Sequence, residues 1–343
     1  MTIDNSTIKK IAIIRIGKIG DMIVSNFALK KIRQTFPDAN ILLITLPRVK
    51  ELLQYSEDIN KIHYFQKGFD LFNVLLLLRK FKADLMIDFN DGPSGTSKVI
   101  AQFSRSKIKV GFGFENNSKY LTIPVKRPDN ETSHVTDRIK LIGEAIGLTF
   151  LPGEIKPSLT IGPREFNSVK NQLNRANSKR KPIIAVNLSA GDKTRYWTVD
   201  KWWKLLMEIK KVEKDIIFLL LSAPTDVHIA KDVGTPFPSD TIIFPAYSDF
   251  QHFASYIAQA DLLISPDTSA VHIACAFSIP LIALYPNISW NYASWKPVNT
   301  VFQSVMPESG NVSEIQWEKV YQAYCQIRPD IQAFSGKRNL VSE

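Results

Sequence analysis

Short apolar runs alternate with amphipathic stretches along the first half of the chain. Apolar runs about as long as one buried strand occupy 11–16, 41–46 and 85–89. Apolar residues at helical spacing predict helices at 25–36 and 71–81 and a third helix that begins at 98. This alternation of strand and helix is typical of a parallel sheet covered by helices on both faces.

The same rhythm starts again after a weakly periodic stretch at 151–163 and a polar, basic one at 167–181. Further strands are predicted at 183–187, 216–222, 262–265 and 281–285, and helices at 198–211, 249–258, 270–277 and 313–327. We expect the last helix to stop before Pro329, because proline continues a helix poorly. The pattern therefore predicts an α/β protein with two doubly wound, Rossmann-like domains, 1–165 and 166–343, joined near 155–180.

Length and composition fit two globular domains. The chain has 343 residues, 45% of them hydrophobic and 22% charged, which is enough for two separate cores. No apolar run approaches the roughly 20 residues that span a bilayer, and the N-terminal MTIDNSTIKK lacks the build of a signal peptide. We therefore expect a cytoplasmic protein whose contact with a membrane, if it has one, is peripheral.

The positive charge is concentrated in the first half. The whole chain carries +10, and residues 1–165 hold 25 basic against 17 acidic residues. Such a field attracts polyanions, among them nucleic acid, an anionic membrane face or a phosphorylated glycolipid, although a basic surface can also serve solubility alone. Because no nucleic-acid-binding module is recognisable, nucleic acid is the weakest of these partners.

The first candidate motif, IIRIGKIGDMIVSNFALKKIR, joins the first strand to the next helix. Gly17 and Gly20, on either side of Lys18, allow a sharp turn and close approach of a ligand to the backbone. The motif is not GxGxxG, and the acid at Asp21 would repel a dinucleotide pyrophosphate, which argues against a nicotinamide-dependent oxidoreductase. Asp21 either caps the helix or acts in a functional site.

The second motif, LLISPDTSAVHIACAFSIPLIALY, predicts a strand, a polar loop and a helix. Thr268 and Ser269 at the helix start, with its free N–H groups, form a candidate cradle for a diphosphate. Asp267 either binds a ribose or sugar hydroxyl or caps the helix. His272 either contacts phosphate or packs in the interior.

The third motif, NLSAGDKTRYWTVDKWWKLL, places Ser189, Lys193 and Arg195 on a loop beyond a strand, where cations can neutralise a leaving diphosphate. A fourth loop carries Asp88 and Asp91, which either contact an acceptor or reflect turn chemistry. Aspartates do not occur as a DxD pair, the five histidines are scattered, and the two cysteines are expected to be buried thiols. We therefore expect no metal and no cofactor.

In this order the motifs resemble glycosyltransferase family 9, the ADP-heptose:lipopolysaccharide heptosyltransferases. The opening glycine–aspartate motif, SKIKVGFGF, SHVTDRIKLIGEAIGL, the Arg195-Tyr196-Trp197 loop and DTSAVHIA carry the resemblance over nearly the whole chain. It implies a GT-B fold, in which the two domains face a central cleft. It also implies an inverting, metal-independent transfer from an ADP-sugar to lipopolysaccharide core or another surface glycan.

The resemblance also implies roles for the candidate residues. Asp21 would be the general base, and Arg195 would stabilise the departing diphosphate as a second catalytic residue. The donor would be held by the C-terminal domain, through Ser189, Lys193, Arg195, Asp267, Thr268, Ser269 and His272. The lipid-linked anionic acceptor would lie against the N-terminal domain near the inner membrane face, with Gly17, Lys18, Gly20, Asp88 and Asp91 as the expected contacts.

Three departures leave the donor open. Arg195 stands where many members of the family have lysine, Ser269 where glycine is common, and Pro224 where some place an acid near the nucleotide ribose. A different nucleotide sugar, or a catalytically silent sugar-nucleotide-binding homologue, therefore remains an alternative to an ADP-heptose transferase.

Overall fold

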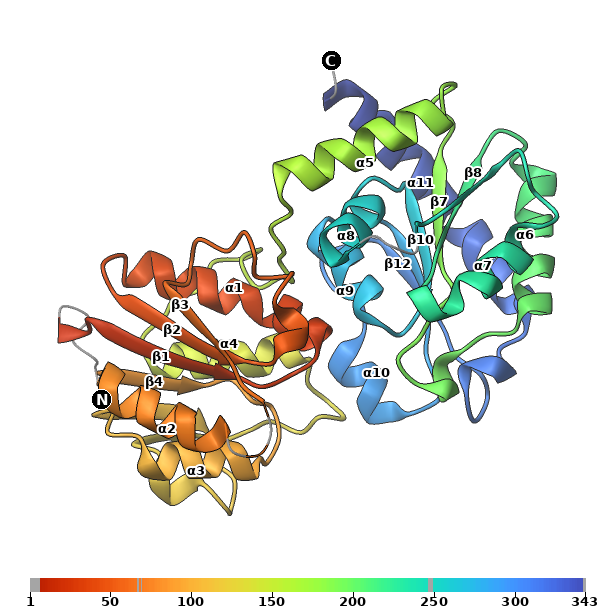
Figure 1. The fold of residues 1–343 in the computed structure, drawn as a ribbon. Coiled ribbons are helices and arrows are strands. Elements are labelled where there is room, and N and C mark those ends of the chain that lie inside the picture. The colour runs from red at the N-terminus through yellow and green to blue at the C-terminus, as the bar shows by residue number, and fades with distance from the viewer. Residues whose placement is uncertain (1–6, 67, 69, 246–248, 342–343) are drawn as a thin grey trace. The chain divides into compact units, whose positions relative to one another are not determined.

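The computed structural model describes residues 7–66, 68, 70–245 and 249–341, with side chains described as far as residue 329. The chain divides into two units, each built around its own parallel sheet (Figure 1). Unit 1 comprises Met1–Thr160 and Ala293–Trp295, and unit 2 comprises Ile161–Tyr292 and Lys296–Glu343.

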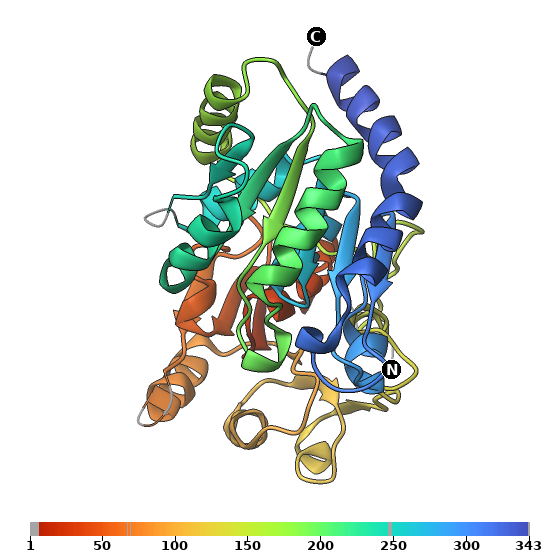
Figure 2. The same cartoon turned by 90° about the vertical axis from the view of Figure 1, so that its right-hand side faces the viewer.

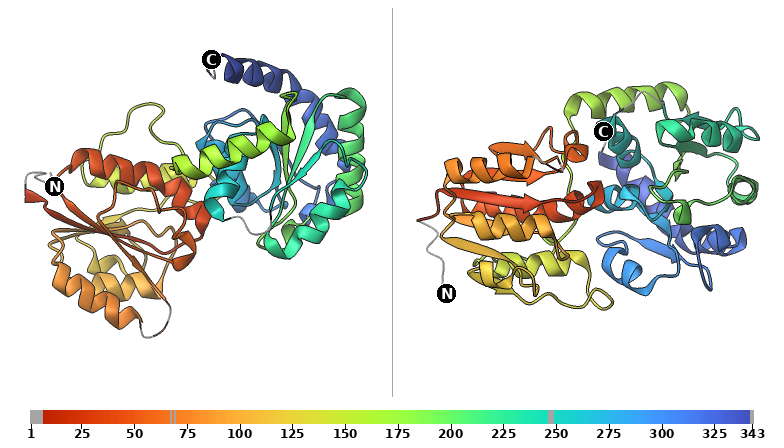
Figure 3. Two further views of the ribbon diagram at one scale, coloured as in Figure 1. Left: turned by 45° about the horizontal axis from the view of Figure 1, so that its top comes forward. Right: turned by 60° about the horizontal axis from the view of Figure 1, so that its bottom comes forward.

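Unit 1 contains a six-stranded parallel sheet of order β3-β2-β1-β4-β5-β6. Its strands are β1 (Lys10–Arg15), β2 (Asn40–Thr45), β3 (Lys61–Tyr64), β4 (Leu85–Asp88), β5 (Ile108–Phe112) and β6 (Ile123–Val125). Its helices are α1 (Ile19–Thr35), α2 (Asp70–Phe81), α3 (Gly95–Phe103) and α4 (Val135–Ala145). Helix α1 packs with α4 and helix α2 with α3, and Figure 3 (left) shows α1 and α2 on opposite faces of the sheet.

The central strands of unit 1 are apolar because both of their faces are covered. Ala12 and Ile14 of β1 face α2 and α3, where they pack with Val74 and Ile100. Ile11 and Ile13, which alternate with them, are also fully buried. A strand buried on both faces reads as a continuous apolar run, and this is the signal that the sequence carries.

Unit 2 repeats this architecture with the order β12-β11-β10-β7-β8-β9, again all parallel. Its strands are β7 (Ile183–Asn187), β8 (Ile217–Leu221), β9 (Thr241–Ile243), β10 (Leu262–Pro266), β11 (Leu281–Leu284) and β12 (Phe302–Val305). Its helices are α5 (Pro163–Ala176), α6 (Val199–Val212), α7 (Val227–Gly234), α8 (Phe250–Ala258), α9 (Ser269–Ala276), α10 (Ser289–Trp295, shared with unit 1) and α11 (Trp317–Val341). Figure 2 shows α6 and α11 side by side on one face of this sheet, where they contact each other.

Both sheets are doubly wound, as predicted. In each, the first strand lies between the second and the fourth strand of its unit, so the chain reverses direction across the sheet at β1/β4 and at β7/β10. This reversal is the topological switch point at which open parallel sheets bind their ligands. The carboxyl ends of these four strands therefore define where to look for a site in each unit.

The hydrophobic pattern predicts the central strands and misses the edges. The four edge strands, β3, β6, β9 and β12, are mostly half-buried or exposed and lack a continuous apolar run. Strand β5, next to β6, was not predicted either, and its first two residues are only half-buried. Strands with one open side carry polar residues, so periodicity distinguishes them poorly from loops.

Three helix predictions need correction. Helix α1 begins at Ile19 and not at 25. The prediction missed its first turns because residues 22–29 are all buried and show no amphipathic pattern. Part of the segment expected to join the domains is α5, which starts with Pro163 at its first position and buries Val169 and Leu173. Helix α11 continues through Pro329, where both Pro329 and Cys325 are exposed, so water can bind the carbonyl that loses its partner.

No helix among the described residues is both long and apolar enough to cross a bilayer. The longest, α11, spans 25 residues but has a mixed composition.

The core of unit 2 generates a stability prediction. Trp202 on α6 is fully buried and meets the Trp197 ring edge-to-face, with centroids 4.6 Å apart. We expect Trp202→Ala to lower the free energy of unfolding of unit 2 by about 3–5 kcal/mol, because the cavity would be large. The neighbouring Trp203 is 36% exposed and donates one hydrogen bond, to the Asp232 carbonyl, so Trp203→Ala should cost about 1 kcal/mol or less.

Urea unfolding followed by tryptophan fluorescence and circular dichroism measures both variants. If Trp202→Ala and Trp203→Ala lowered the free energy of unfolding equally, the described core would be wrong.

Candidate functional site

In unit 1 the glycine-containing loop connects the end of β1 to the start of α1 at the β1/β4 switch point. Lys18 is the residue before the helix, and Asp21 is its third residue. The Asp21 Oδ2 atom accepts the Lys18 backbone N–H at 2.7 Å. Asp21 therefore lies inside the first turn and not at the capping position itself, but its carboxylate still satisfies one free donor of the helix start.

Gly17 makes this geometry possible. A Cβ atom at position 17 would lie 2.7 Å from the Cβ and 2.8 Å from the Cγ of Asp21, much closer than atoms can approach. The Asp21 carboxylate thus folds back over a position where a side chain would not fit. Gly20 is the second residue of α1 and belongs to the helix.

Arg15, the last residue of β1, holds the Asp21 carboxylate in place through an ion pair. Its Nη2 lies 3.2 Å from Asp21 Oδ1, and its Nη1 donates to the Phe89 carbonyl at 2.8 Å. The arginine side chain is 3% exposed, whereas that of Asp21 is 22% exposed. The carboxylate is therefore held by two donors and still reaches solvent, so part of its capacity to accept protons or hydrogen bonds remains available.

Asp88, at the end of β4, is buried beside this loop. Its Oδ1 accepts hydrogen bonds from the backbone and the side chain of Asn90, at 3.0 and 2.7 Å. The Asn90 Oδ1 in turn accepts the Ile16 N–H at 2.8 Å, which ties the two strand ends together. Burial raises the pKa of Asp88 above its usual value, although the Asn90 hydrogen bonds and the charge of Arg15 act against the rise.

Asp91, the other candidate acceptor contact, is occupied by two arginines. Both of its carboxylate oxygens pair with Arg138, at 2.8 and 2.7 Å, and with Arg127, at 3.1 and 3.2 Å. Arg138 is almost fully buried, so this pair holds the loop after β4 to the start of α4. The structure therefore brings Gly17, Asp21 and Asp88 together at the switch point and engages Asp91 in a separate ion-pair cluster.

In unit 2, Arg195 and Asp267 meet at the β7/β10 switch point. Arg195 Nη1 lies 3.1 Å from Asp267 Oδ2 and donates to the Asp267 carbonyl at 2.9 Å. Asn291 Nδ2 donates to the same Asp267 Oδ2 at 2.8 Å. The aspartate is 5% exposed and the arginine 30% exposed, so a guanidinium that still reaches solvent is held beside the loop that leads into α9.

Thr268 caps α9 and connects it to β7. Its Oγ1 accepts the Ala270 N–H at 3.2 Å and a hydrogen bond from Asn187 Nδ2 at 3.1 Å. Thr268 and Ser269 are half-buried at the helix start, whereas His272, in the first turn, is buried with 5% of its surface exposed. A helix start with partial positive charge, hydroxyl groups and a fixed arginine has the composition of an anion-binding site.

Ser189 lies on the same edge but turns toward β8. Its Oγ accepts the Ala223 N–H at 2.8 Å, and Tyr196 donates to Asp226 Oδ2 at 2.7 Å. Burial alone would raise the pKa of Asp226, but hydrogen bonds from Ser189 and Tyr196 outweigh it and hold the pKa below its usual value. The remaining candidate, Lys193, is exposed in the short helical turn η4 (Lys193–Arg195) on the same loop.

Four polar residues that sequence reasoning missed organise these loops: Arg15, Asn90, Asn187 and Asn291. Arg15 and Asn187 each end an otherwise apolar strand, and a polar residue in that position is a signal that could have been used. Asn291 follows a segment without a recognisable motif, and only the fold brings it to Asp267.

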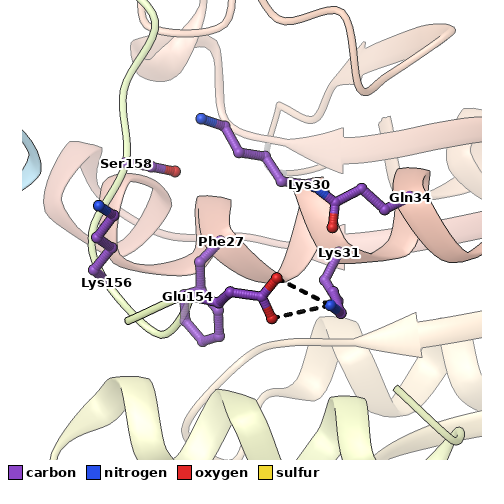
Figure 4. Close-up of a pocket in the computed structure, with 7 residues that line it drawn as sticks. All are labelled: Phe27, Lys30, Lys31, Gln34, Glu154, Lys156 and Ser158. Carbon is purple, nitrogen blue, oxygen red and sulfur yellow. Dashed lines mark hydrogen bonds and ion pairs between the residues drawn. The ribbon is translucent and has the colours of Figure 1, made fainter. Parts of the chain in front are cut away.

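A pocket of about 170 Å³ lies elsewhere in unit 1, along the side of α1 (Figure 4). It is lined by Phe27, Lys30, Lys31, Gln34, Glu154, Lys156 and Ser158. Glu154 pairs with Lys31 at 2.9 Å, and with Lys30 and Lys156 the lining contains three lysines against one acid. Of the α1 residues that line the pocket, Phe27 is the nearest to Asp21, and the two are about 9 Å apart along the helix axis. The pocket is therefore separate from the switch point.

Within the described ranges, no group of three His, Cys, Asp or Glu side chains is arranged to hold a metal ion. Cys275 is a buried free thiol as expected, and burial raises its pKa to about 12. Cys325 was also expected to be buried, but it lies on an exposed position of α11.

Comparisons with known proteins identify the family. The family model described as "Glycosyltransferase family 9 (heptosyltransferase)" matches residues 75–324. The lipopolysaccharide core heptosyltransferase OpsX of Haemophilus influenzae is 21% identical over 283 residues, which cover 81% of this chain and 79% of that protein.

Two solved structures share the fold. A glycosyltransferase family 9 protein from Veillonella parvula superposes with a TM-score of 0.78 at 15% identity, covering 93% of this chain and 97% of that one. The E. coli heptosyltransferase WaaC with ADP gives a TM-score of 0.72 at 14% identity, covering 93% and 98%. The predicted GT-B class of two doubly wound sheets is thereby confirmed. Because the family match covers well over half of its residues, the chain belongs to glycosyltransferase family 9, the heptosyltransferase family.

Proposed function

We propose that this protein is an inverting glycosyltransferase that moves a heptose or a related sugar from an ADP-sugar to an anionic, lipid-linked surface glycan such as lipopolysaccharide core. Unit 2 binds the donor and unit 1 the acceptor. The transfer uses no metal, and the protein meets the inner membrane face only peripherally.

The observation that carries the proposal is the arginine fixed at the start of α9. Arg195 is held by Asp267 at the switch point of unit 2, next to the hydroxyls and N–H groups of Thr268 and Ser269. A guanidinium and a helix N-terminus together can neutralise a diphosphate without a cation. The structure of a family relative with ADP, whose fold this chain shares, supports an adenine nucleotide as the ligand.

Asp21 has the properties that the base of this reaction needs. As the acceptor oxygen attacks the anomeric carbon, its proton passes to the Asp21 carboxylate, and the bond to the donor diphosphate breaks on the opposite face of the sugar. The leaving diphosphate takes the electron pair, and Arg195 with the start of α9 stabilises the charge. Arg15 and the Lys18 N–H fix the carboxylate in place, which keeps it oriented for proton transfer.

The remaining donor contacts in this proposal are Ser189, Lys193, Asp267 and His272. Gly17, Lys18 and Gly20 form the backbone surface against which the acceptor lies. Asp88 and Asp91 act there mainly by positioning, since Asp88 is 5% exposed and Asp91 is paired with Arg127 and Arg138.

Donor binding is tested by calorimetric titration with ADP, ADP-heptose, UDP and GDP in the presence of EDTA. We expect selective binding of ADP and ADP-heptose. Arg195→Ala should weaken ADP binding at least about tenfold, because it removes a charge-assisted contact and leaves Asp267 facing the diphosphate. Arg175→Ala, at an exposed position of α5, should bind ADP as the unchanged protein does.

Preference for UDP or GDP would mean that the donor is a different nucleotide sugar. Binding only with added magnesium would contradict a metal-independent donor site. If no nucleotide binds, the proposed transferase is wrong.

The role of Asp21 is tested with Asp21→Asn in a transfer assay on truncated lipopolysaccharide. Asparagine can still accept the Lys18 N–H but loses the ion pair with Arg15, so the thermal midpoint is measured beside the rate to separate loss of the base from loss of fold. We expect kcat to fall by about 10²–10⁴, with ADP binding unchanged.

The matched control is Asp137→Asn. Asp137 occupies the same third position of α4 but is exposed, so its replacement should leave kcat unchanged. Full activity of Asp21→Asn would exclude Asp21 as the base.

A further inference from the structure

Helix α2 of unit 1 exposes apolar side chains that take no part in its packing against the sheet. Val74 and Leu78 are buried against the sheet, while Phe72 is 65% and Leu76 41% exposed. Phe72 and Leu76 lie one turn apart, so they share the outer face of the helix. Arg79 and Lys80 continue the same face one turn further on and are exposed.

Helix α3, the neighbour of α2, also carries exposed apolar and basic side chains near its end. It packs beside α2 in the same layer, as Figures 1 and 3 show. Its last residue, Phe103, is 60% exposed and is followed closely by the exposed Arg105 and Lys107. We call this surface the α2–α3 face and define it by Phe72, Leu76, Arg79, Lys80, Phe103, Arg105 and Lys107.

The charges on this surface have one sign. Residues 71–107 are all described, and every exposed charged side chain among them is basic: Arg79, Lys80, Lys82, Arg105 and Lys107. The acids of the segment are occupied elsewhere. Asp84 accepts two backbone N–H groups at the start of β1, Asp88 is buried, and Asp91 pairs with two arginines.

We propose that the α2–α3 face docks unit 1 onto an anionic lipid surface. Exposed phenylalanine and leucine beside arginine and lysine, on helices that lie flat against a sheet, suit the interface of a bilayer. The apolar side chains enter the headgroup boundary and the basic ones pair with lipid phosphates. The apolar and electrostatic contributions act together, so binding requires both.

This docking rests on the proposed peripheral contact with the membrane and names the surface that would make it, but it does not depend on the identity of donor or acceptor. It places the enzyme at the surface where a lipid-linked acceptor is found, and it concerns a part of unit 1 separate from Asp21. A vesicle-binding experiment without nucleotide or glycan can therefore fail or succeed independently of the transferase assay.

The test is cosedimentation of the full chain with vesicles of phosphatidylcholine alone or mixed with phosphatidylglycerol. We expect binding to the mixed vesicles that weakens as salt is raised, because the basic side chains contribute through a screened field. Arg79→Gln with Lys80→Gln should weaken it by about 25-fold, from roughly fivefold for each charge. Phe72→Ser with Leu76→Ser should weaken it at least about tenfold.

The matched controls lie in unit 2. Met207→Ser removes an apolar side chain of α6 that is 48% exposed. Lys170→Gln combined with Arg175→Gln removes two exposed charges of α5. Both controls should bind vesicles as the unchanged protein does. All replaced side chains are at the surface, so each variant should keep its thermal midpoint and its ADP affinity.

Three results would overturn the proposal. The first is vesicle binding that both α2–α3 variants retain. The second is equal binding to vesicles with and without phosphatidylglycerol. The third is a concentration-dependent dimer in sedimentation that Phe72→Ser dissolves, since this would assign the face to a second copy of the chain.

Discussion

A parallel strand buried on both faces has room for a polar side chain only at its end. The four strands at the switch points of the two sheets follow that constraint. Arg15 ends β1, Asp88 ends β4, Asn187 ends β7, and Ser265 precedes the last residue of β10, and all four are at most 5% exposed. Each is hydrogen-bonded, as buried polar groups must be, and each contacts a candidate site residue or the loop that carries one. The core and the site are thus linked at the carboxyl edge of each sheet.

The two units use this shared frame for different chemistry. In unit 1 a buried arginine supports a partly exposed carboxylate, an arrangement that suits accepting a proton. In unit 2 a buried aspartate supports a partly exposed arginine, which suits stabilising negative charge. The two units therefore use opposite arrangements: the buried charge is positive in unit 1 and negative in unit 2, although both sheets have the same strand order. Proton removal and departure of a diphosphate require charges of opposite sign, so this division fits the proposed transfer.

The sequence predicted the parts of the fold whose burial leaves a periodic signal. Central strands such as β7 and helices such as α6 were predicted to within a residue or so. The edge strands and the first turns of α1 were not, because mixed exposure in the strands and uniform burial of residues 22–29 in the helix remove the period on which the prediction rests. For the site, the motif residues were recognisable as loop chemistry, whereas Asn90 and Asn291 act through contacts 74 and 24 residues away in the chain. Such partners are set by the tertiary fold, and no local pattern marks them.

Capping and catalysis looked like alternatives for Asp21, but the geometry makes them compatible. The carboxylate accepts the Lys18 N–H with one oxygen and pairs with Arg15 through the other, and it remains 22% exposed. Two donors do not exhaust the acceptor capacity of a carboxylate, so the same contacts that complete the helix start also fix its orientation. Gly17 serves this arrangement directly, because any larger residue would occupy the space of the Asp21 side chain. A loop that held an aspartate only as a cap would not need the second contact from a buried arginine. That contact is costly to bury and has a clear use if the carboxylate must keep one position while it takes a proton.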